Sequence, residues 1–133
     1  DDQVYGNKGD DQLFGGQEND DLFGGQANDL IYGNLGDDRI YGNKGTDTLF
    51  GGEGDDEFAF LSGDGQDTVA DFSDGDTIAF QADINGSGAE NFADLTITET
   101  DAGDAVIELG DGNSVTLQGV AADELSEADF SFF

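Results

Sequence analysis

The fold of this chain is decided by residues 6–59, which divide without remainder into six nine-residue units: GNKGDDQLF, GGQENDDLF, GGQANDLIY, GNLGDDRIY, GNKGTDTLF and GGEGDDEFA. Residues 1–5, DDQVY, match the second half of a further unit. Every complete unit opens with Gly, has Asp at its sixth position and has a large apolar residue at its eighth. A period this regular indicates a repeat architecture, in which each unit packs mainly against its neighbours.

The charge of the chain is extreme for its size. Its 133 residues include 32 acidic and only 3 basic side chains, for a formal net charge of −29. Self-repulsion on this scale opposes compaction. The 22 glycines, 11 phenylalanines and strict period nevertheless indicate one domain that folds once the charge is neutralised. So few basic residues argue against direct nucleic-acid binding, and no apolar run approaches the roughly 20 residues of a membrane span.

Several kinds of chemistry are missing. Without cysteine there are neither disulfides nor thiolate metal sites, and without histidine most zinc sites and the commonest general base are absent. No Gly-x-Ser-x-Gly, HExxH, P-loop or EF-hand motif occurs. We therefore expect a non-catalytic region. Because the chain starts within a repeat and without Met, we also expect it to be part of a longer protein, which can itself be an enzyme.

Within a unit, positions one to six are turn-like and positions seven to nine are strand-like. Gly provides positive φ in the turn, and Asn7, Asn34 and Asn43 replace it at position two, where Asn is the best-tolerated alternative. Glu18 and Ala27 stand at position four, where Gly is expected, so we predict strain there. Strand alternation turns the eighth side chain inward. The predicted core row is Val4, Leu13, Leu22, Ile31, Ile40, Leu49 and Phe58.

The units resemble the RTX nonapeptide, Gly-Gly-x-Gly-x-Asp-x-apolar-x, of hemolysin-type calcium-binding proteins. The resemblance covers about 59 of the 133 residues. It implies an all-β fold, a right-handed parallel β-roll (the RTX solenoid), in which two units complete one circuit. Residues eighteen apart in sequence would then stack about 4.8 Å from each other.

Stacking of this kind sorts the sixth-position aspartates into two rows, one on each edge of the coil. The first row is Asp2, Asp20, Asp38 and Asp56, and the second row is Asp11, Asp29 and Asp47. Like charges in a row disfavour folding. A calcium ion between consecutive turns, bound by carboxylates and turn carbonyls, reverses that effect.

The gaps between neighbouring turns predict about five Ca²⁺ ions or more. By the resemblance, the sixth-position Asp is the side-chain ligand. The small apolar core of a unit does not offset the backbone entropy of ordering nine residues. We therefore predict that folding and calcium binding are one process.

Position nine provides an aromatic ladder: Tyr5, Phe14, Phe23, Tyr32, Tyr41 and Phe50. If position eight faces inward, these rings line the outer faces of the coil. Two interpretations remain open. The rings pack on one another along each sheet, or they offer a surface to carbohydrate or a protein partner.

After residue 59 the nine-residue register is lost. We divide the chain into a repeat β-roll, residues 1–59, and a C-terminal capping region, residues 60–133, which fold as one cooperative unit. Residues 58–80 alternate as strands do and resemble the Asp-x-apolar-x-Asp-Phe segment that commonly follows RTX arrays. One further cation site that ends the coil, with a solvated loop as the alternative, is predicted from Asp64, Asp67, Asp71 and Asp76.

The rest of the capping region is predicted to be a small antiparallel β cap. A helical turn over residues 89–95 precedes three strands, residues 95–99, 105–109 and 114–117, of which the last two are joined by the turn signal GDGN. Such a cap would protect the exposed end of the coil from edge-to-edge growth.

The chain closes with ELSEADFSFF, in which an acidic residue, Asp129, precedes Phe130, Phe132 and Phe133. This ending resembles the uncleaved C-terminal signal of type I secretion. The alternative is a last strand that buries its phenylalanines in the cap. Both can hold, because a signal read in the unfolded chain can be buried later.

These features favour a calcium-binding module that folds after type I secretion and stabilises a larger extracellular protein. Its partners would be calcium ions, the type I secretion machinery and an upstream catalytic or adhesive domain. The alternative is a glycan-binding accessory module of a polysaccharide-modifying enzyme, with weak glycan binding through the aromatic ladder. A surface adhesin or self-assembling element has only the stacked geometry to support it.

Overall fold

The computed structural model describes residues 1–133 and contains thirteen β-strands and four short 3₁₀ turns. The strands are β1 (Gln3–Lys8), β2 (Gln12–Gln17), β3 (Asp21–Gln26), β4 (Leu30–Leu35), β5 (Arg39–Lys44), β6 (Thr48–Glu53), β7 (Glu57–Phe60), β8 (Gln66–Val69), β9 (Thr77–Phe80), β10 (Thr96–Glu99), β11 (Ala105–Gly110), β12 (Asn113–Leu117) and β13 (Phe130–Phe132). The 3₁₀ turns are η1 (Ile84–Gly86), η2 (Phe92–Asp94), η3 (Ala122–Glu124) and η4 (Glu127–Asp129). No helix has the length and apolar character needed to cross a membrane.

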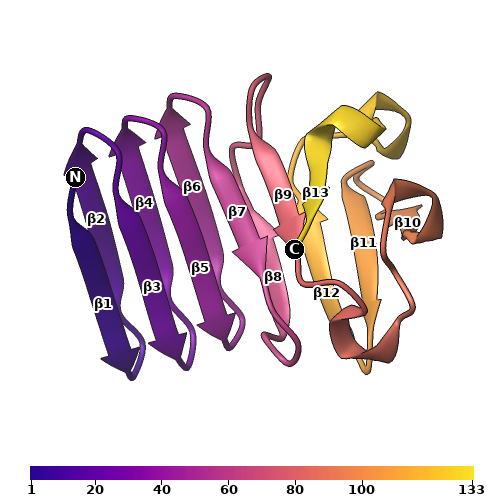
Figure 1. Ribbon diagram of the computed structural model, residues 1–133, viewed down its shortest axis with the longest axis horizontal. Coiled ribbons are helices and arrows are strands. Elements are labelled where there is room, and N and C mark those ends of the chain that lie inside the picture. Colours follow the sequence, from indigo (N-terminus) through magenta and orange to yellow (C-terminus); the bar gives the residue numbers. More distant parts are fainter.

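Successive strands alternate between two sheets, so that the chain winds as a flattened coil (Figure 1). Sheet A has the order β1-β3-β5-β7-β9-β13, and sheet B has the order β10-β11-β12-β8-β6-β4-β2. Repeat strands pair in parallel, and residues eighteen apart are neighbours: Val4 pairs with Leu22, which pairs with Ile40. The all-β parallel roll with two units per circuit is therefore confirmed.

The repeat strands are longer than the sequence predicted. Strands β1 to β6 each have six residues and run from position seven of one unit through position three of the next. The prediction that positions one to three belong to the turn is wrong. At position two the backbone bends to positive φ, 77° at Asn7, without leaving the ladder, because Asn7 still pairs with Gly25. The turn proper comprises positions four to six.

The position-four exceptions behave as expected. Glu18 and Ala27 have φ values of 73° and 83°, in the left-handed region that disfavours side chains with a Cβ. The backbone at position four thus keeps the conformation that glycine favours, and Glu18 and Ala27 are strained there.

The core of the roll is the row of eighth-position side chains, enclosed between the two sheets. Leu22, Ile31, Ile40, Leu49 and Phe58 are completely buried, and Leu13 is 3% exposed. Only Val4, at the N-terminal end, is partly exposed. The predicted core is therefore confirmed.

The coil does not stop with the repeats. Strands β8 and β9 stack in parallel on β6 and β7, but the circuit is now twenty residues long, since Leu49 pairs with Val69 and Phe58 with Ile78. Strand β12 adds in parallel to β8, and the C-terminal strand β13 adds in parallel to β9. Both sheets are thus continuous across residue 59.

The antiparallel part of the cap lies at the far end of sheet B. Strands β10, β11 and β12 pair with one another antiparallel, within one residue of the three predicted strands. The predicted helical turn corresponds to η2. Buried cap residues join the same core as the repeats, including Ile107, Leu117 and Phe130.

Candidate metal centre

The sixth-position aspartates form two rows, one at each edge of the coil, as their spacing predicts. Within a row, the backbone N–H of each Asp donates to Oδ1 of the Asp one circuit later. In the first row the N–H of Asp20 lies 2.8 Å from Oδ1 of Asp38, and that of Asp38 lies 2.8 Å from Oδ1 of Asp56. In the second row Asp29 donates to Asp47 in the same way, at 2.7 Å.

The second oxygen of these carboxylates has no partner. Oδ2 is buried and accepts no hydrogen bond in Asp11, Asp20, Asp29, Asp38, Asp47 and Asp56. Five of these residues, all except Asp11, are at most 3% exposed. A buried carboxylate oxygen without a donor is costly, and a regular series of them indicates that a cation belongs there.

Backbone carbonyls lie beside the unpartnered oxygens because position one is Gly. A Cβ added to Gly15 would lie 2.6 Å from the carbonyl oxygen of Gly33 and 2.9 Å from Oδ2 of Asp20. The same approach recurs at Gly24, next to Oδ2 of Asp29 and the carbonyl of Gly42. Carboxylate and carbonyl oxygens that share such a cradle are the donor set that calcium prefers, so the residues present fit this ion.

Burial makes the rows hard to ionise without a metal. The pKa of Asp47 is raised to about 7, mainly by burial and to a smaller extent by repulsion from Asp29 and Asp64, against the hydrogen bond from Asp29, which lowers it. Burial likewise raises the pKa of Asp56 to about 6 and shifts the pKa values of Asp29 and Asp38 upward. A divalent cation would favour the charged form of all four.

Position five supplies a second ladder that sequence reasoning missed. Asn19 Oδ1 accepts the N–H of Asp37, and Asp37 Oδ1 accepts the N–H of Asp55, both at 3.0 Å. On the other edge Asn28 Oδ1 accepts the N–H of Thr46 at 2.9 Å. Here the later turn donates to the earlier one, opposite to the direction at position six. The available signal was the restriction of this position to Asp, Asn or Thr in all six units.

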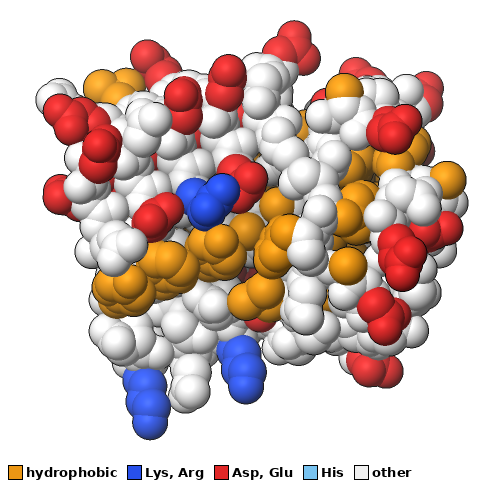
Figure 2. Space-filling model, viewed as in Figure 1, with side chains coloured by type: hydrophobic (Ala, Val, Ile, Leu, Met, Phe, Trp, Pro, Cys, Tyr) orange, Lys and Arg blue, Asp and Glu red, His pale blue; other side chains and the backbone are white.

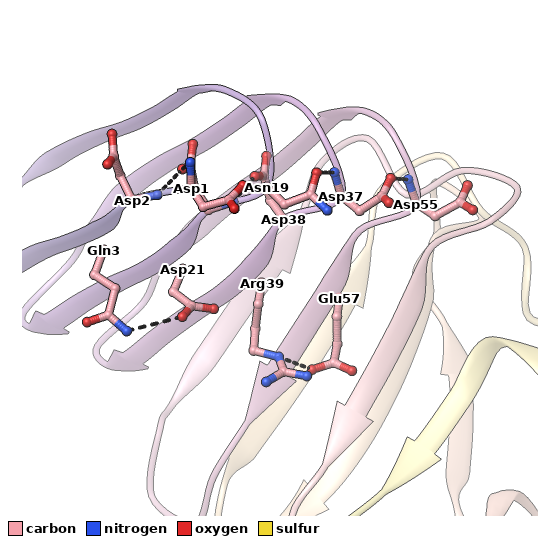
Figure 3. A pocket seen from close by; sticks show the side chains of 11 residues that line it. Asp1, Asp2, Gln3, Asn19, Asp21, Asp37, Asp38, Arg39, Asp55 and Glu57 are labelled. Atoms are coloured by element: carbon pink, nitrogen blue, oxygen red, sulfur yellow. Dashed lines mark hydrogen bonds and ion pairs between the residues drawn. The ribbon is translucent and has the colours of Figure 1, made fainter.

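The first edge opens on a trough of about 540 Å³ with no hydrophobic lining. Figure 3 shows Asp1, Asn19, Asp37 and Asp55 following one another along the turns, with the side chains of the strand starts beside them. Among these, Arg39 pairs with Glu57 on the neighbouring strand. The trough is therefore acidic, with one basic side chain at its border.

The aspartates after the repeats do not gather into the single site predicted from them. Asp67 extends the second row, because its Oδ1 accepts the N–H of Asp47, and Asp64 is buried nearby. Asp76 extends the first row by accepting the N–H of Asp56, with Asp71 bound to the adjacent Gly51 turn. Nowhere do three carboxylates converge as a preformed metal cluster. The physical reason is that the coil continues, so the four residues are divided between its edges.

The aromatic ladder forms on both outer faces. On sheet A the rings of Tyr5, Phe23 and Tyr41 stack with centroids 4.9 Å apart. On sheet B Phe14, Tyr32 and Phe50 stack at 5.2 and 4.7 Å. Mutual packing is thus present, and on the face shown in Figure 2 the aromatic side chains form a continuous strip.

All three basic residues lie on sheet A. Lys8 is in β1, and Arg39 and Lys44 are in β5. Figure 2 shows them on both sides of the aromatic strip, on a molecule whose charge is otherwise acidic.

Comparison with known proteins identifies the repeats. A family model of the RTX calcium-binding nonapeptide repeat (four copies) matches residues 1–31 and 23–58. Among solved structures, the fold is similar to the AlgE6R3 subunit of the mannuronan C5-epimerase from Azotobacter vinelandii, with a TM-score of 0.70 and 28% identity over 91% of this chain and 77% of that one. The AlgE6R2 subunit of the same enzyme has a TM-score of 0.65 and 26% identity, and the match covers 97% of this chain and 91% of that subunit.

A third similar structure is the extracellular lipase LipA from Serratia marcescens, with a TM-score of 0.58 and 26% identity. The match covers 85% of this chain but only 19% of the lipase. No curated protein sequence matches the chain. With the repeat pattern, the parallel roll and the paired rows of aspartate in agreement, residues 1–58 of the chain are RTX calcium-binding nonapeptide repeats.

Proposed function

We propose that this chain is a calcium-dependent folding module, in which ions bound between the turns make the roll stable. The observation that carries the proposal is the series of six buried Oδ2 atoms without a hydrogen-bond donor. Each would cost about 1–3 kcal/mol if left unpaired. Calcium between stacked turns would satisfy these oxygens and neutralise part of the −29 net charge.

The number of ions follows from the gaps. The repeats contain three gaps in the first row and two in the second, which gives five sites, all lying between residues 2 and 56. The side-chain ligands are the sixth-position aspartates, and the turn carbonyls complete the shell.

The same dependence on calcium suits export. Extracellular calcium modules bind with dissociation constants of about 10⁻⁴–10⁻³ M, so the chain stays unfolded in the cytosol and folds outside. Type I secretion machinery would read residues 124–133 in the unfolded chain. Phe130 is 8% exposed in the folded protein and contacts Phe80, so this segment then becomes part of the fold. The similarity to an extracellular lipase supports an extracellular location.

In the folded state the module would stabilise a larger protein and not act on a substrate itself. The region after residue 59 closes both sheets at the C-terminal end, with β13 on sheet A and β10–β12 on sheet B. This arrangement supports a division into the repeat roll, residues 1–59, and the capping region, residues 60–133, that fold together.

The test is circular dichroism of the purified chain in chelator, in magnesium and in calcium. We expect β structure only with millimolar calcium, its loss on chelation and its recovery on adding calcium again. Cooperative thermal unfolding in chelator at low ionic strength would overturn the proposal.

A second candidate function, glycan binding, is favoured by one observation. The three basic side chains lie on the same face as the aromatic strip of sheet A, one beside the strip and two at the edge of the face (Figure 2), a combination that suits an acidic sugar polymer. Titration calorimetry of calcium-loaded protein with acidic oligosaccharides tests it. Tyr5→Ala should weaken binding, whereas Phe14→Ala on sheet B, equally exposed, should not. Absence of heat, or equal effects of both substitutions, counts against it.

A further inference from the structure

One asparagine of this chain is chemically less stable than the others. The chain has eight asparagines, and only Asn85 is followed by Gly. The backbone nitrogen of a following Gly is not shielded by a side chain, and Gly adopts most backbone conformations. This nitrogen therefore reaches the preceding side-chain amide more readily than that of any other residue. In the unfolded chain, spontaneous loss of a side-chain amide is thus fastest at Asn85–Gly86.

The reaction needs only water. The nitrogen of Gly86 attacks Cγ of Asn85, so a carbon–nitrogen bond forms there and the bond from Cγ to Nδ2 breaks. Ammonia leaves and carries away the proton of the Gly86 N–H. Water then opens the five-membered imide at one of its two carbonyl groups. The products are aspartate and isoaspartate, and in isoaspartate the backbone passes through the former side chain.

In the folded protein the reacting groups are held by hydrogen bonds. The N–H of Gly86 donates to the carbonyl of Asp83 at 2.9 Å, so the nucleophile is engaged. Oδ1 of Asn85 accepts the N–H of Gly63 at 2.7 Å, and the N–H of Asn85 donates to Oγ of Ser62 at 2.9 Å. These bonds hold Asn85 at φ 53° and ψ 24°. Because closure of the imide ring requires a different ψ, the bonds must break before the reaction proceeds.

The same bonds make Asn85 a clamp between two loops. Ser62 and Gly63 lie in the loop after β7, and Asn85 lies in η1, after β9. The neighbouring Ile84 is completely buried in the core. Nδ2 of Asn85 is buried and has no hydrogen-bond partner. An aspartate at this position would bury a negative charge, which is costly, and isoaspartate would lengthen the backbone of the clamp.

Building on the calcium module proposed above, we propose that Asn85–Gly86 is a modification site that is reactive in the unfolded chain and protected by folding. Calcium-driven folding preserves the amide, and an amide lost before folding weakens the clamp. A chain that stays unfolded therefore loses its capacity to fold with time, whereas a folded chain retains it.

Peptide mapping measures the reaction at this site directly. The chain is incubated at mildly alkaline pH in calcium, in a calcium-selective chelator, in that chelator with magnesium, and in denaturant, and is then cleaved after Glu. The fragment of residues 58–90 contains Asn85 as its only Asn, so its aspartate and isoaspartate forms give the rate. We expect the reaction to be at least about tenfold slower in calcium than in the other three solutions, because several hydrogen bonds must open first.

A variant that carries the product tests the clamp. Asn85→Asp should raise the calcium concentration at the folding midpoint several-fold, or prevent folding. The matched control is Gln118→Glu, which adds the same charge at an exposed position whose side chain makes no hydrogen bond. This control should fold with a midpoint close to that of the parent chain. Equal midpoints for the two variants would overturn the clamp.

Circular dichroism in the same four solutions separates the two proposals. If the chain is equally folded in chelator and in calcium, the calcium module is refuted, and the rate in denaturant relative to the folded state decides whether the fold protects Asn85. If calcium folds the chain but the reaction is as fast as in chelator, the protection is refuted and the calcium module stands.

Discussion

The two carboxylate oxygens of Asp38 lie in different surroundings. Oδ1 accepts the N–H of Asp20, whereas Oδ2 is buried with no donor. One oxygen thus holds the preceding turn, and the other is available to a cation. The charge and the hydrogen bond of this residue can therefore be removed separately.

Substitutions at Asp38 should affect calcium binding more than substitutions at the N-terminal end. Asp38 has a neighbour on each side, Asp20 and Asp56, while Asp2 is exposed and has only Asp20. We expect Asp38→Ala to raise the calcium concentration at the folding midpoint about tenfold, equivalent to about 1.4 kcal/mol. Asp2→Ala should change it much less. Calcium titrations followed by circular dichroism give both midpoints.

A matched variant, Asp38→Asn, separates the two effects at this position. It keeps an acceptor for the N–H of Asp20 but removes the charge, so its midpoint should lie close to that of Asp38→Ala if the charge dominates. Equal midpoints for Asp2→Ala and Asp38→Ala would show that position in the row is irrelevant.

Individual residues were predictable from the sequence only where the period holds. The eighteen-residue stacking placed Asp20, Asp38 and Asp47 correctly on their edges. After Phe60 the circuit lengthens to twenty residues, and the period no longer tells which turn Asp64 or Asp71 will face. Their contacts depend on the conformation of the loop after the repeats, which the repeat pattern does not predict.

At the scale of elements, each turn is held by two hydrogen-bond ladders of opposite direction. Position six accepts from the turn before it, and position five accepts from the turn after it. Every interior turn is thus tied to both neighbours, independently of the strand pairing.

The position-five ladder should contribute to stability without binding metal. Asn28→Ala leaves the N–H of Thr46 without its acceptor, so we expect a loss of about 0.5–1.5 kcal/mol in the calcium-loaded protein. Gln26→Ala, at an exposed position whose side chain makes no hydrogen bond, is the control. Chemical denaturation in excess calcium measures both. A free energy of unfolding equal to that of Gln26→Ala would contradict a structural role for position five.

Strand length was harder to predict than strand position. Gly and Asn at positions one and two are typical of turns, yet here they lie inside six-residue strands. Local propensity is overridden because neighbouring circuits provide ladder partners, as Asn34 has in Gly16 and Gly52. The sequence of a single unit does not show these ladder partners, so it does not predict the longer strand.

For the whole molecule, protons and calcium compete for the same carboxylates. The pKa values of Asp47 and Asp67 are raised to about 7, and that of Asp56 to about 6, mainly by burial. An unfolded Asp has a pKa of about 3.9. Protonation therefore stabilises the metal-free roll below about pH 4, and this stabilisation is lost as the pH rises through 6 to 7.

Two consequences of this competition are measurable. In chelator, we expect more β structure at about pH 4 than at about pH 8. In calcium, the number of ions bound per folded chain at subsaturating calcium should fall as the pH falls from about 8 to about 5, because protons then occupy the same carboxylates. Asp47→Asn should reduce this pH dependence, whereas Asp74→Asn, at an exposed carboxylate outside both rows, should not. A number of bound ions that is independent of pH would exclude competition.

The overall architecture followed from the period, while the closing of its C-terminal end did not. The alternation of core and turn residues predicts a parallel roll, and the turn signal before residue 114 predicts the β11–β12 hairpin. What could not be foreseen is that β12 and β13 join the sheets in parallel, continuing them from residues up to fifty-two positions away. Pairing at such a distance is set by which edges remain free.

Because two units make one circuit, the outer surface of the roll depends on whether the number of repeats changes by an even or an odd count. Insertion or removal of two units between Phe23 and Tyr41 would leave Tyr5 and Lys8 on the face that carries Lys44. A single unit would move them to the opposite face. The core and the aspartate rows would be the same in both cases, since all six units contribute an equivalent core residue and an equivalent Asp. A partner that binds the aromatic strip would meet a different surface after an odd change in repeat number. Repeat number can therefore alter partner binding while the folded core stays the same.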